Sequence, residues 1–101
     1  MTEKDILLTT CVEECCETGQ RATKSLRFGL DHRQESEIPS EYAENSVRLV
    51  EEFNDLYAVM EMMYERGMIH TIVDRELVND KKKRVLKYMD LSRKLNILKD
   101  E

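Results

Sequence analysis

The stretch VEEFNDLYAVMEMM, residues 50–63, decides the fold that the sequence predicts. Its apolar side chains recur every three or four residues, which is the spacing of one face of an α-helix. The whole chain contains only three glycines and one proline, and such scarcity favours long helices over a turn-rich β fold. The predicted apolar face comprises Leu49, Phe53, Leu56, Tyr57, Met60, Met63 and Tyr64.

Breaks at glycine and proline divide the chain into three predicted helices. Ser40 follows the only proline and is suited to cap the second helix, which should end at Gly67. In chain order we expect a helix over residues 5–27, a loop over 31–40, a helix over 40–66, a connection or strand over 68–74 and a helix over 75–95. The prediction is an all-α fold with a single domain over residues 1–101. We expect an antiparallel bundle of three to four helices per chain, completed by oligomerisation.

Composition and charge exclude several classes of protein. The 101 residues are 41% hydrophobic and 37% charged, which is typical of a globular chain, and the net charge of −5 argues against a nucleic-acid partner. There is no apolar run long enough for a membrane span, and the first ten residues carry charges where a signal peptide is apolar, so we expect a cytoplasmic protein. Three cysteines within residues 11–16, without histidines at ligand spacing, favour packing over a disulfide framework or a zinc site.

Two predicted helices carry the same pair of carboxylates beside a packing surface. Glu14 and Glu17 are three residues apart on the first helix, and Glu52 and Asp55 are three apart on the second. If the two helices pack antiparallel, the four carboxylates can converge, and a hard cation such as Mg²⁺ or Mn²⁺ would compensate their charge. Each pair alone is more typical of a solvated helix face than of a ligand site, but two such pairs on consecutive helices leave both interpretations open. The packing face expected on the first helix comprises Leu8, Cys11, Cys15, Thr18 and Ala22.

The third predicted helix carries cations that are suited to phosphate. Lys81 and Arg84 fall on its apolar stripe, in line with Tyr88, whereas Lys82 and Lys83 lie off the stripe in a solvated run. A cation that points inward requires an anion, and both arginine and lysine bind phosphate oxygens.

Three motifs in the right order resemble one family. EECCE and EEFND resemble the E-E-x-x-E and E-x-x-D signature of the MazG-like nucleotide pyrophosphohydrolases, which are all-α NTP pyrophosphatases. KKKRVLKYMDLSRKLNIL resembles the K-x-x-K-V-x-K-Y-M helix of small phage and bacterial members, and KSLRFGLD is similar to the segment after their first motif. The resemblance implies Mg²⁺-dependent cleavage of a nucleoside triphosphate between its α and β phosphates, which gives a monophosphate and pyrophosphate.

The resemblance also implies roles for individual residues. Glu14, Glu17, Glu52 and Asp55 would bind the metal, with Glu13 as a supporting carboxylate. A water held at the site would attack in line, and Glu13 or Glu17 would accept its proton. The predicted catalytic carboxylates are therefore Glu13, Glu14 and Glu17, and the predicted phosphate-binding residues are Lys24, Lys81, Arg84 and Tyr88. The chain departs from the family in the long gap of 34 residues between Glu17 and Glu52, and in Arg84, which stands where many relatives have lysine.

Two alternatives to this function stay open at the level of sequence. One is a non-catalytic helical module whose acidic patches bind a partner protein. The other is the same chemistry on an alarmone or a damaged nucleotide, because nothing in the sequence identifies a base or a sugar. In either case the long apolar second helix predicts a homodimer or homotetramer.

Overall fold

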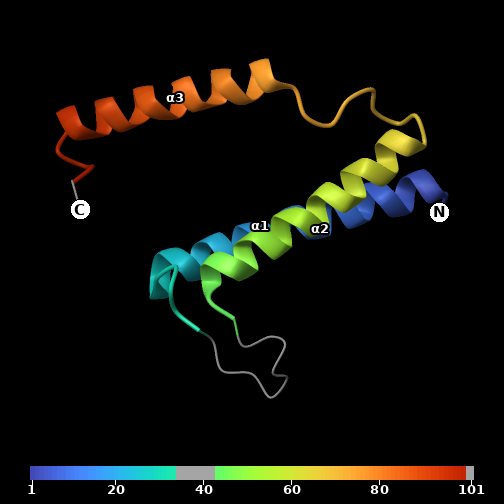
Figure 1. The fold of residues 1–101 in the computed structure, drawn as a ribbon, viewed down its shortest axis with the longest axis horizontal. Coiled ribbons are helices and arrows are strands. Elements are labelled where there is room, and N and C mark those ends of the chain that lie inside the picture. Colours follow the sequence, from blue (N-terminus) through green and yellow to red (C-terminus); the bar gives the residue numbers. More distant parts are fainter. Residues whose placement is uncertain (34–42, 100–101) are drawn as a thin grey trace. The chain divides into compact units, whose positions relative to one another are not determined.

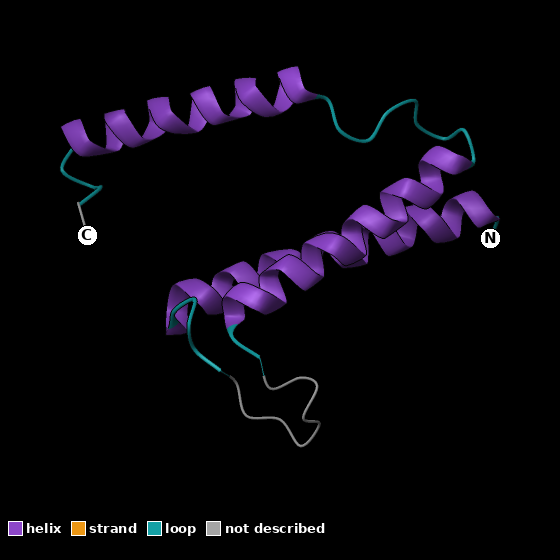
Figure 2. Ribbon diagram, in the orientation of Figure 1, coloured by secondary structure: helices purple, strands orange, loops and turns teal. Residues whose placement is uncertain are grey.

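The computed structural model describes residues 1–33 and 43–99 as three α-helices joined by loops (Figures 1 and 2). They are α1 (Glu3–Phe28), α2 (Asn45–Glu65) and α3 (Arg75–Lys94). Within these ranges there is no strand, so residues 68–74 form a connection, and the all-α prediction is confirmed. The chain divides into two compact units, Met1–His70 and Thr71–Glu101. No helix in the described ranges is long and apolar enough to cross a membrane.

Local hydrogen bonds fix where α1 and α3 begin. Thr2 and Asp5 form a reciprocal capping box: the Thr2 amide donates to Asp5 Oδ2 (2.9 Å) and the Asp5 amide donates to Thr2 Oγ1 (3.2 Å). Asp74 caps α3, since its Oδ1 accepts from the amide of Glu76 at 2.9 Å. Both ends follow from residue types that are favoured at helix starts, and both agree with the sequence prediction to within about two residues.

The start of α2 differs from the prediction. Ser40 lies outside the described residues, and the residue before the first turn is Glu44, which makes no side-chain cap bond. The amides at the start of α2 donate instead to carbonyls of the segment that follows α1: Asn45 to His32 (3.0 Å) and Ser46 to Leu30 (2.8 Å). Tertiary contacts therefore satisfy this helix end and make a side-chain cap unnecessary. The prediction of a helix from residue 40 was wrong at residues 43 and 44, which are not helical.

Helices α1 and α2 form an antiparallel hairpin in which matching contacts recur every seven residues along each helix. Leu7 packs with Val59 in the buried core, Glu14 shares a carboxylate cluster with Glu52, and Arg21 bonds to Asn45. A seven-residue step keeps one line of side chains facing a neighbouring helix. We call this line of contacts the seam of the hairpin. Among the described residues, the buried apolar side chains are Leu7, Val59 and Met63, and partly buried apolar residues pack against them: Cys11, Met60, Met68 and Ile69. Beyond this end of the hairpin, the seam carries the polar pairs named above.

The packing face predicted for α1 was only partly right. Cys11 and Thr18 are half-buried on the seam, as expected, but Leu8, Cys15 and Ala22 are exposed. At 100° per residue, these three side chains lie about 60–100° around the helix from Leu7. The prediction was wrong for these three residues because the side of α1 that faces α2 carries polar residues. The position of apolar residues therefore did not identify the side that packs.

A second apolar surface lies on one side of the hairpin, away from the contact between α1 and α2. Four side chains lie about 100° from the seam, in the same rotational sense on both helices. Because the helices are antiparallel, the two sets face the same side of the hairpin. This apolar face comprises Leu8 (50% exposed) and Leu26 (89%) of α1, and Phe53 (54%) and Tyr64 (49%) of α2. The prediction that Phe53 and Tyr64 belong to a buried face is therefore not met within the single chain.

Candidate metal centre

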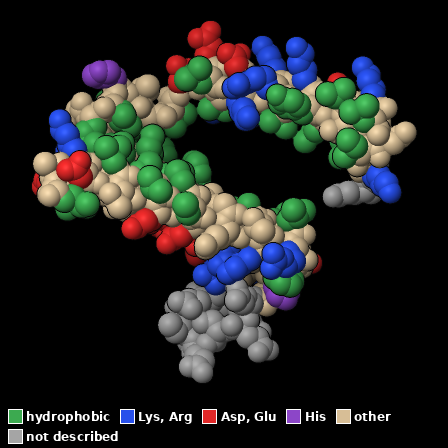
Figure 3. All heavy atoms as spheres, turned by 180° about the vertical axis from the view of Figure 1, so that it is seen from behind, with side chains coloured by type: hydrophobic (Ala, Val, Ile, Leu, Met, Phe, Trp, Pro, Cys, Tyr) green, Lys and Arg blue, Asp and Glu red, His purple; other side chains and the backbone are tan. Residues whose placement is uncertain are grey.

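Three carboxylates converge across the middle of the hairpin. Glu14 and Glu17 project from one turn of α1, and Glu52 comes from the facing turn of α2. Each offers a carboxylate oxygen, and these atoms all lie within 4.8 Å of one another. Figure 3 shows acidic side chains gathered along one edge of the hairpin. The hairpin thus brings together three of the four predicted ligands.

Asp55, the fourth predicted ligand, lies beside this cluster. It follows Glu52 by three residues on α2, and its negative charge raises the pKa of both Glu14 and Glu52. Asp55 and Glu17 are both exposed, and both are rotated away from the seam in the sense opposite to the apolar face. The cluster therefore opens toward solvent on the side that the apolar face does not occupy.

The electrostatics of the cluster are unfavourable without a cation. Burial raises the pKa of Glu14, and the charges of Glu17 and Asp55 raise it further. Burial also raises the pKa of Glu52, with added contributions from the same two neighbours, while Arg21 lowers it. One buried oxygen, Glu14 Oε2, has no hydrogen-bond partner among the described residues. A buried carboxylate oxygen without a donor destabilises the fold, and a cation would remove that cost.

The donor set fits a hard divalent cation. Oxygen ligands without thiolate or imidazole are preferred by Mg²⁺ and Mn²⁺. Opposite ligands of Mg²⁺ are separated by twice its oxygen distance, or about 4.2 Å. The oxygens of Glu14, Glu17 and Glu52 therefore need to move little to bind one ion.

A buried arginine continues the seam next to the carboxylates. Arg21 is only 6% exposed, and its Nη1 donates to Oδ1 of Asn45 (3.1 Å), which is 1% exposed. Burial and the charge of Arg48 lower the pKa of Arg21, whereas Glu52 and Glu51 raise it. Its Nε has no hydrogen-bond partner among the described residues. No motif assigned a role to Arg21 or Asn45, but counting seven residues from Glu14 and from Glu52 would have found both.

The remaining predicted residues of α1 lie at the edges of the cluster. Glu13 is exposed and is not one of the three converging carboxylates. Lys24 is half-buried and lines a cavity of about 170 Å³, together with Phe28, His32 and Asn45. Lys24 is thus the predicted phosphate ligand that the hairpin itself holds near Arg21.

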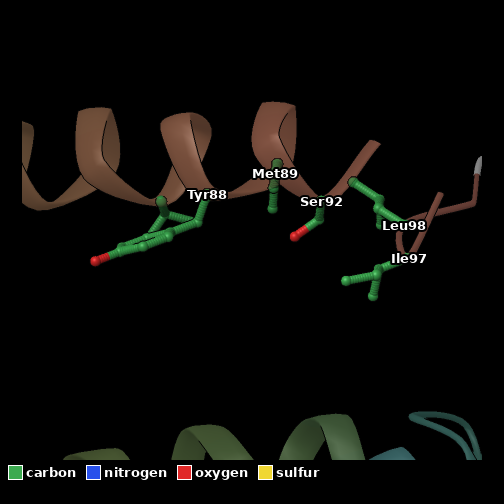
Figure 4. A pocket seen from close by; sticks show the side chains of 6 residues that line it. Tyr88, Met89, Ser92, Ile97 and Leu98 are labelled. Carbon is green, nitrogen blue, oxygen red and sulfur yellow. The ribbon is translucent and has the colours of Figure 1, made fainter. Parts of the chain in front are cut away.

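The other predicted phosphate ligands belong to the second compact unit. Lys81, Arg84 and Tyr88 are all exposed on α3. Tyr88 also borders an apolar groove of about 280 Å³ near the end of the helix, which Figure 4 shows from close by. The other residues that line this groove are Val85, Met89, Ser92, Ile97 and Leu98. The roles of Lys81, Arg84 and Tyr88 at phosphate stay predictions.

No protein-family model matches the chain, and no curated protein or solved structure matches it. The resemblance to the MazG-like pyrophosphohydrolases therefore remains a prediction from the motifs.

We expect Mg²⁺ to stabilise the hairpin. A ligand at about 100 times its Kd stabilises the folded state by about 2.7 kcal/mol, which raises Tm by roughly 10–20 °C for a domain of this size. Thermal unfolding followed by circular dichroism, in EDTA and in increasing Mg²⁺, measures this shift. An unchanged Tm at millimolar Mg²⁺ would contradict a cation site in the cluster.

In the metal-free protein, prepared in EDTA, the pH dependence of stability should reveal the raised pKa of Glu52. Because the folded-state pKa of Glu52 lies above its ordinary value of 4.5, the folded state holds more protons than the unfolded state between the two values. Stability therefore falls as pH rises through that interval. Glu52→Gln removes this loss, so its Tm advantage over the wild type should be small below pH 4.5 and should grow toward pH 7. A Tm difference that shrinks with rising pH would show that the charge of Glu52 is stabilising.

Proposed function

We propose that the chain is a Mg²⁺-dependent nucleoside triphosphate pyrophosphohydrolase of the MazG-like class. It would cleave a nucleoside or deoxynucleoside triphosphate between the α and β phosphates, releasing the monophosphate and pyrophosphate. The observation that carries this proposal is the convergence of Glu14, Glu17 and Glu52 from two antiparallel helices. One of their oxygens, on Glu14, is buried and has no hydrogen-bond partner within residues 1–33 and 43–99. The order of the three motifs along the chain adds support.

In this proposal the carboxylates divide between binding and proton transfer. Glu14, Glu17, Glu52 and Asp55 would hold Mg²⁺, or Mn²⁺ in its place. The ion supplies positive charge that stabilises the charge developing on phosphate oxygens in the transition state. Glu17 is exposed at the rim of the cluster, so one of its oxygens can accept a proton from an attacking water. Glu13, exposed one residue before Glu14, would support it or take this role itself.

Basic residues would bind the substrate phosphates. The charge of Arg21 acts on Glu52, and its buried Nε–H, which has no partner among the described residues, would donate to a phosphate oxygen that enters the site. Lys24 is one turn further along α1, and it would bind the phosphate nearest the nucleoside. Lys81, Arg84 and Tyr88 would contribute from α3, and the two cations among them would neutralise the departing pyrophosphate.

The functional form would be at least a homodimer, with a homotetramer as the larger alternative. Support comes from the exposed apolar face, since a hairpin with only three buried apolar side chains in its described part leaves much apolar surface in water. Two hairpins that pair through these faces would form a four-helix arrangement and leave both acidic clusters open to solvent.

Product analysis tests the chemistry directly. Purified protein is incubated with a panel of nucleoside triphosphates, with Mg²⁺, with Mn²⁺ or with EDTA, and the products are separated by anion-exchange chromatography. We expect a monophosphate and pyrophosphate in equal amounts, and no products in EDTA. A diphosphate with orthophosphate would refute cleavage between the α and β phosphates. No cleavage under any condition would favour the alternative of a non-catalytic acidic module.

A further inference from the structure

The cavity at the closed end of the hairpin lies in line with the acidic cluster. Lys24 follows Glu17 by seven residues on α1, and Asn45 precedes Glu52 by seven residues on α2. Seven residues of α-helix span about 10 Å. A nucleotide whose phosphates lie at the carboxylates can therefore reach this cavity with its base. Arg21 lies between the two sites, because it interacts with the charge of Glu52 and bonds to Asn45.

The wall of the cavity has the chemistry of a nucleobase site. Phe28 and His32 pack against each other with ring centroids 5.3 Å apart and ring planes 30° apart. The guanidinium of Arg27 lies 5.8 Å from the centre of the Phe28 ring and helps to hold it. Both rings line the cavity, and a base gains affinity by lying against aromatic side chains. The aromatic wall and Lys24 together suit a planar, electron-rich ring attached to an anion.

A buried amide can read the edge of such a ring. Asn45 is held from both ends, since its Oδ1 accepts from Arg21 (3.1 Å) and its Nδ2 donates to the carbonyl of Gly29 (2.9 Å). A side-chain amide has two N–H donors and two acceptor lone pairs, so one of each remains after these bonds. The backbone carbonyl of Gly29 is placed by a positive φ of 102°, which favours glycine at this turn. Asn45 lines the cavity, and in this proposal its remaining N–H and lone pair would bond to the edge of a base there.

We propose that this cavity binds the base of the nucleotide and selects a single pyrimidine ring over a purine. This inference rests on the proposed function, and it adds the substrate class. Size decides between the two kinds of base. An enclosed apolar cavity of about 150 Å³ holds benzene, so a partly open cavity of about 170 Å³ covers one six-membered ring, whereas the second ring of a purine would extend beyond its walls into solvent.

Binding of analogues that cannot be cleaved tests the inference without turnover. Calorimetry with Mg²⁺ compares the α,β-imido analogues of UTP and ATP on the full chain. We expect the UTP analogue to bind at least about tenfold more tightly, and Phe28→Ala or His32→Ala to weaken it by about tenfold, as loss of a stacking partner does. The same substitutions should bring the two affinities close together and leave the affinity for Mg²⁺-pyrophosphate unchanged, which a general loss of structure would not.

Thr23→Ala is the matched control, because Thr23 belongs to the same region of α1 but is exposed, lies outside the apolar face and does not line the cavity. It should keep the preference for the UTP analogue. Equal binding of the two analogues, no binding of either, or a preference that survives both aromatic substitutions would overturn the inference. Cleavage of all triphosphates at equal rates would refute the base selectivity alone. Pyrimidine-selective binding without any cleavage would refute the proposed function alone.

Discussion

Glu52→Gln should lower turnover of the best nucleoside triphosphate by more than about 100-fold at saturating Mg²⁺, while the hairpin stays folded. Glutamine keeps the size of the side chain but removes the charge that α2 contributes to the three converging carboxylates. Loss of a residue that only orients a metal ligand already costs 10–100-fold, so loss of a ligand should cost at least the upper end of that range. Pyrophosphate release measures kcat/KM, and thermal unfolding in EDTA measures the fold. Glu14→Gln, Glu17→Gln and Asp55→Asn should each have a similar effect.

Glu61→Gln provides the control for this series. Glu61 is exposed on α2 and is not a member of the carboxylate cluster, so the change should leave turnover within about twofold of the wild type. Titration with Mg²⁺ gives a second readout, since ligand variants should need more Mg²⁺ for half-maximal activity and Glu61→Gln should not. If Glu52→Gln retains most of its activity at saturating metal, the four-carboxylate site is wrong.

The helices could be predicted from sequence because their signals are local. Scarce glycine and proline and the spacing of apolar residues gave three helices, and the start expected for α3 at residue 75 agrees with the cap at Asp74. The start of α2 could not be predicted, since bonds from Asn45 and Ser46 to carbonyls of the preceding segment replace a side-chain cap. Such contacts depend on how the chain turns after Gly29, and no local pattern encodes them.

The packing of α1 was harder to predict because its seam is polar. Glu14, Thr18 and Arg21 face α2, while the more apolar Leu8 is exposed. If the apolar stripe of α1 is assumed to face α2, the wrong side of α1 is predicted to pack. The seven-residue repeat was present in the sequence, but it becomes visible only when charged residues are allowed on the seam. Polar seam residues of this kind are expected at functional sites, where local rules are broken.

Part of the candidate site could likewise be predicted from the sequence, and part could not. The convergence of carboxylates could be anticipated as a possibility, because two pairs at three-residue spacing can meet at one level of an antiparallel hairpin, and three of the four carboxylates do so. Arg21 and Asn45 carry no motif, and their importance follows only from burial and from the bond between them. Lys81 and Arg84 were selected by motif and charge, and they lie in the second compact unit, Thr71–Glu101.

Leu8→Glu should convert the protein from a homodimer or larger assembly into a folded monomer of 12.0 kDa. Leu8 is 50% exposed in the single chain, so a glutamate there should cost the hairpin little. In an assembly that covers the apolar face, the same charge would be buried without a partner, which is strongly unfavourable. We therefore expect the dimer Kd to rise by more than about 100-fold, which corresponds to about 2.8 kcal/mol. Light scattering coupled to size exclusion measures the mass, and circular dichroism measures the fold.

Two further variants separate assembly from folding. Thr9→Glu places the same charge one residue along, on the side of α1 turned away from both α2 and the apolar face, and should remain assembled. Met63→Glu places the charge in the core, where Met63 is 6% exposed beside Leu7, and should unfold the hairpin rather than only separate its copies. A wild-type protein that is monomeric and fully active at micromolar concentration would contradict the proposed assembly. A Leu8→Glu protein that stays dimeric would show that the copies pair through another surface.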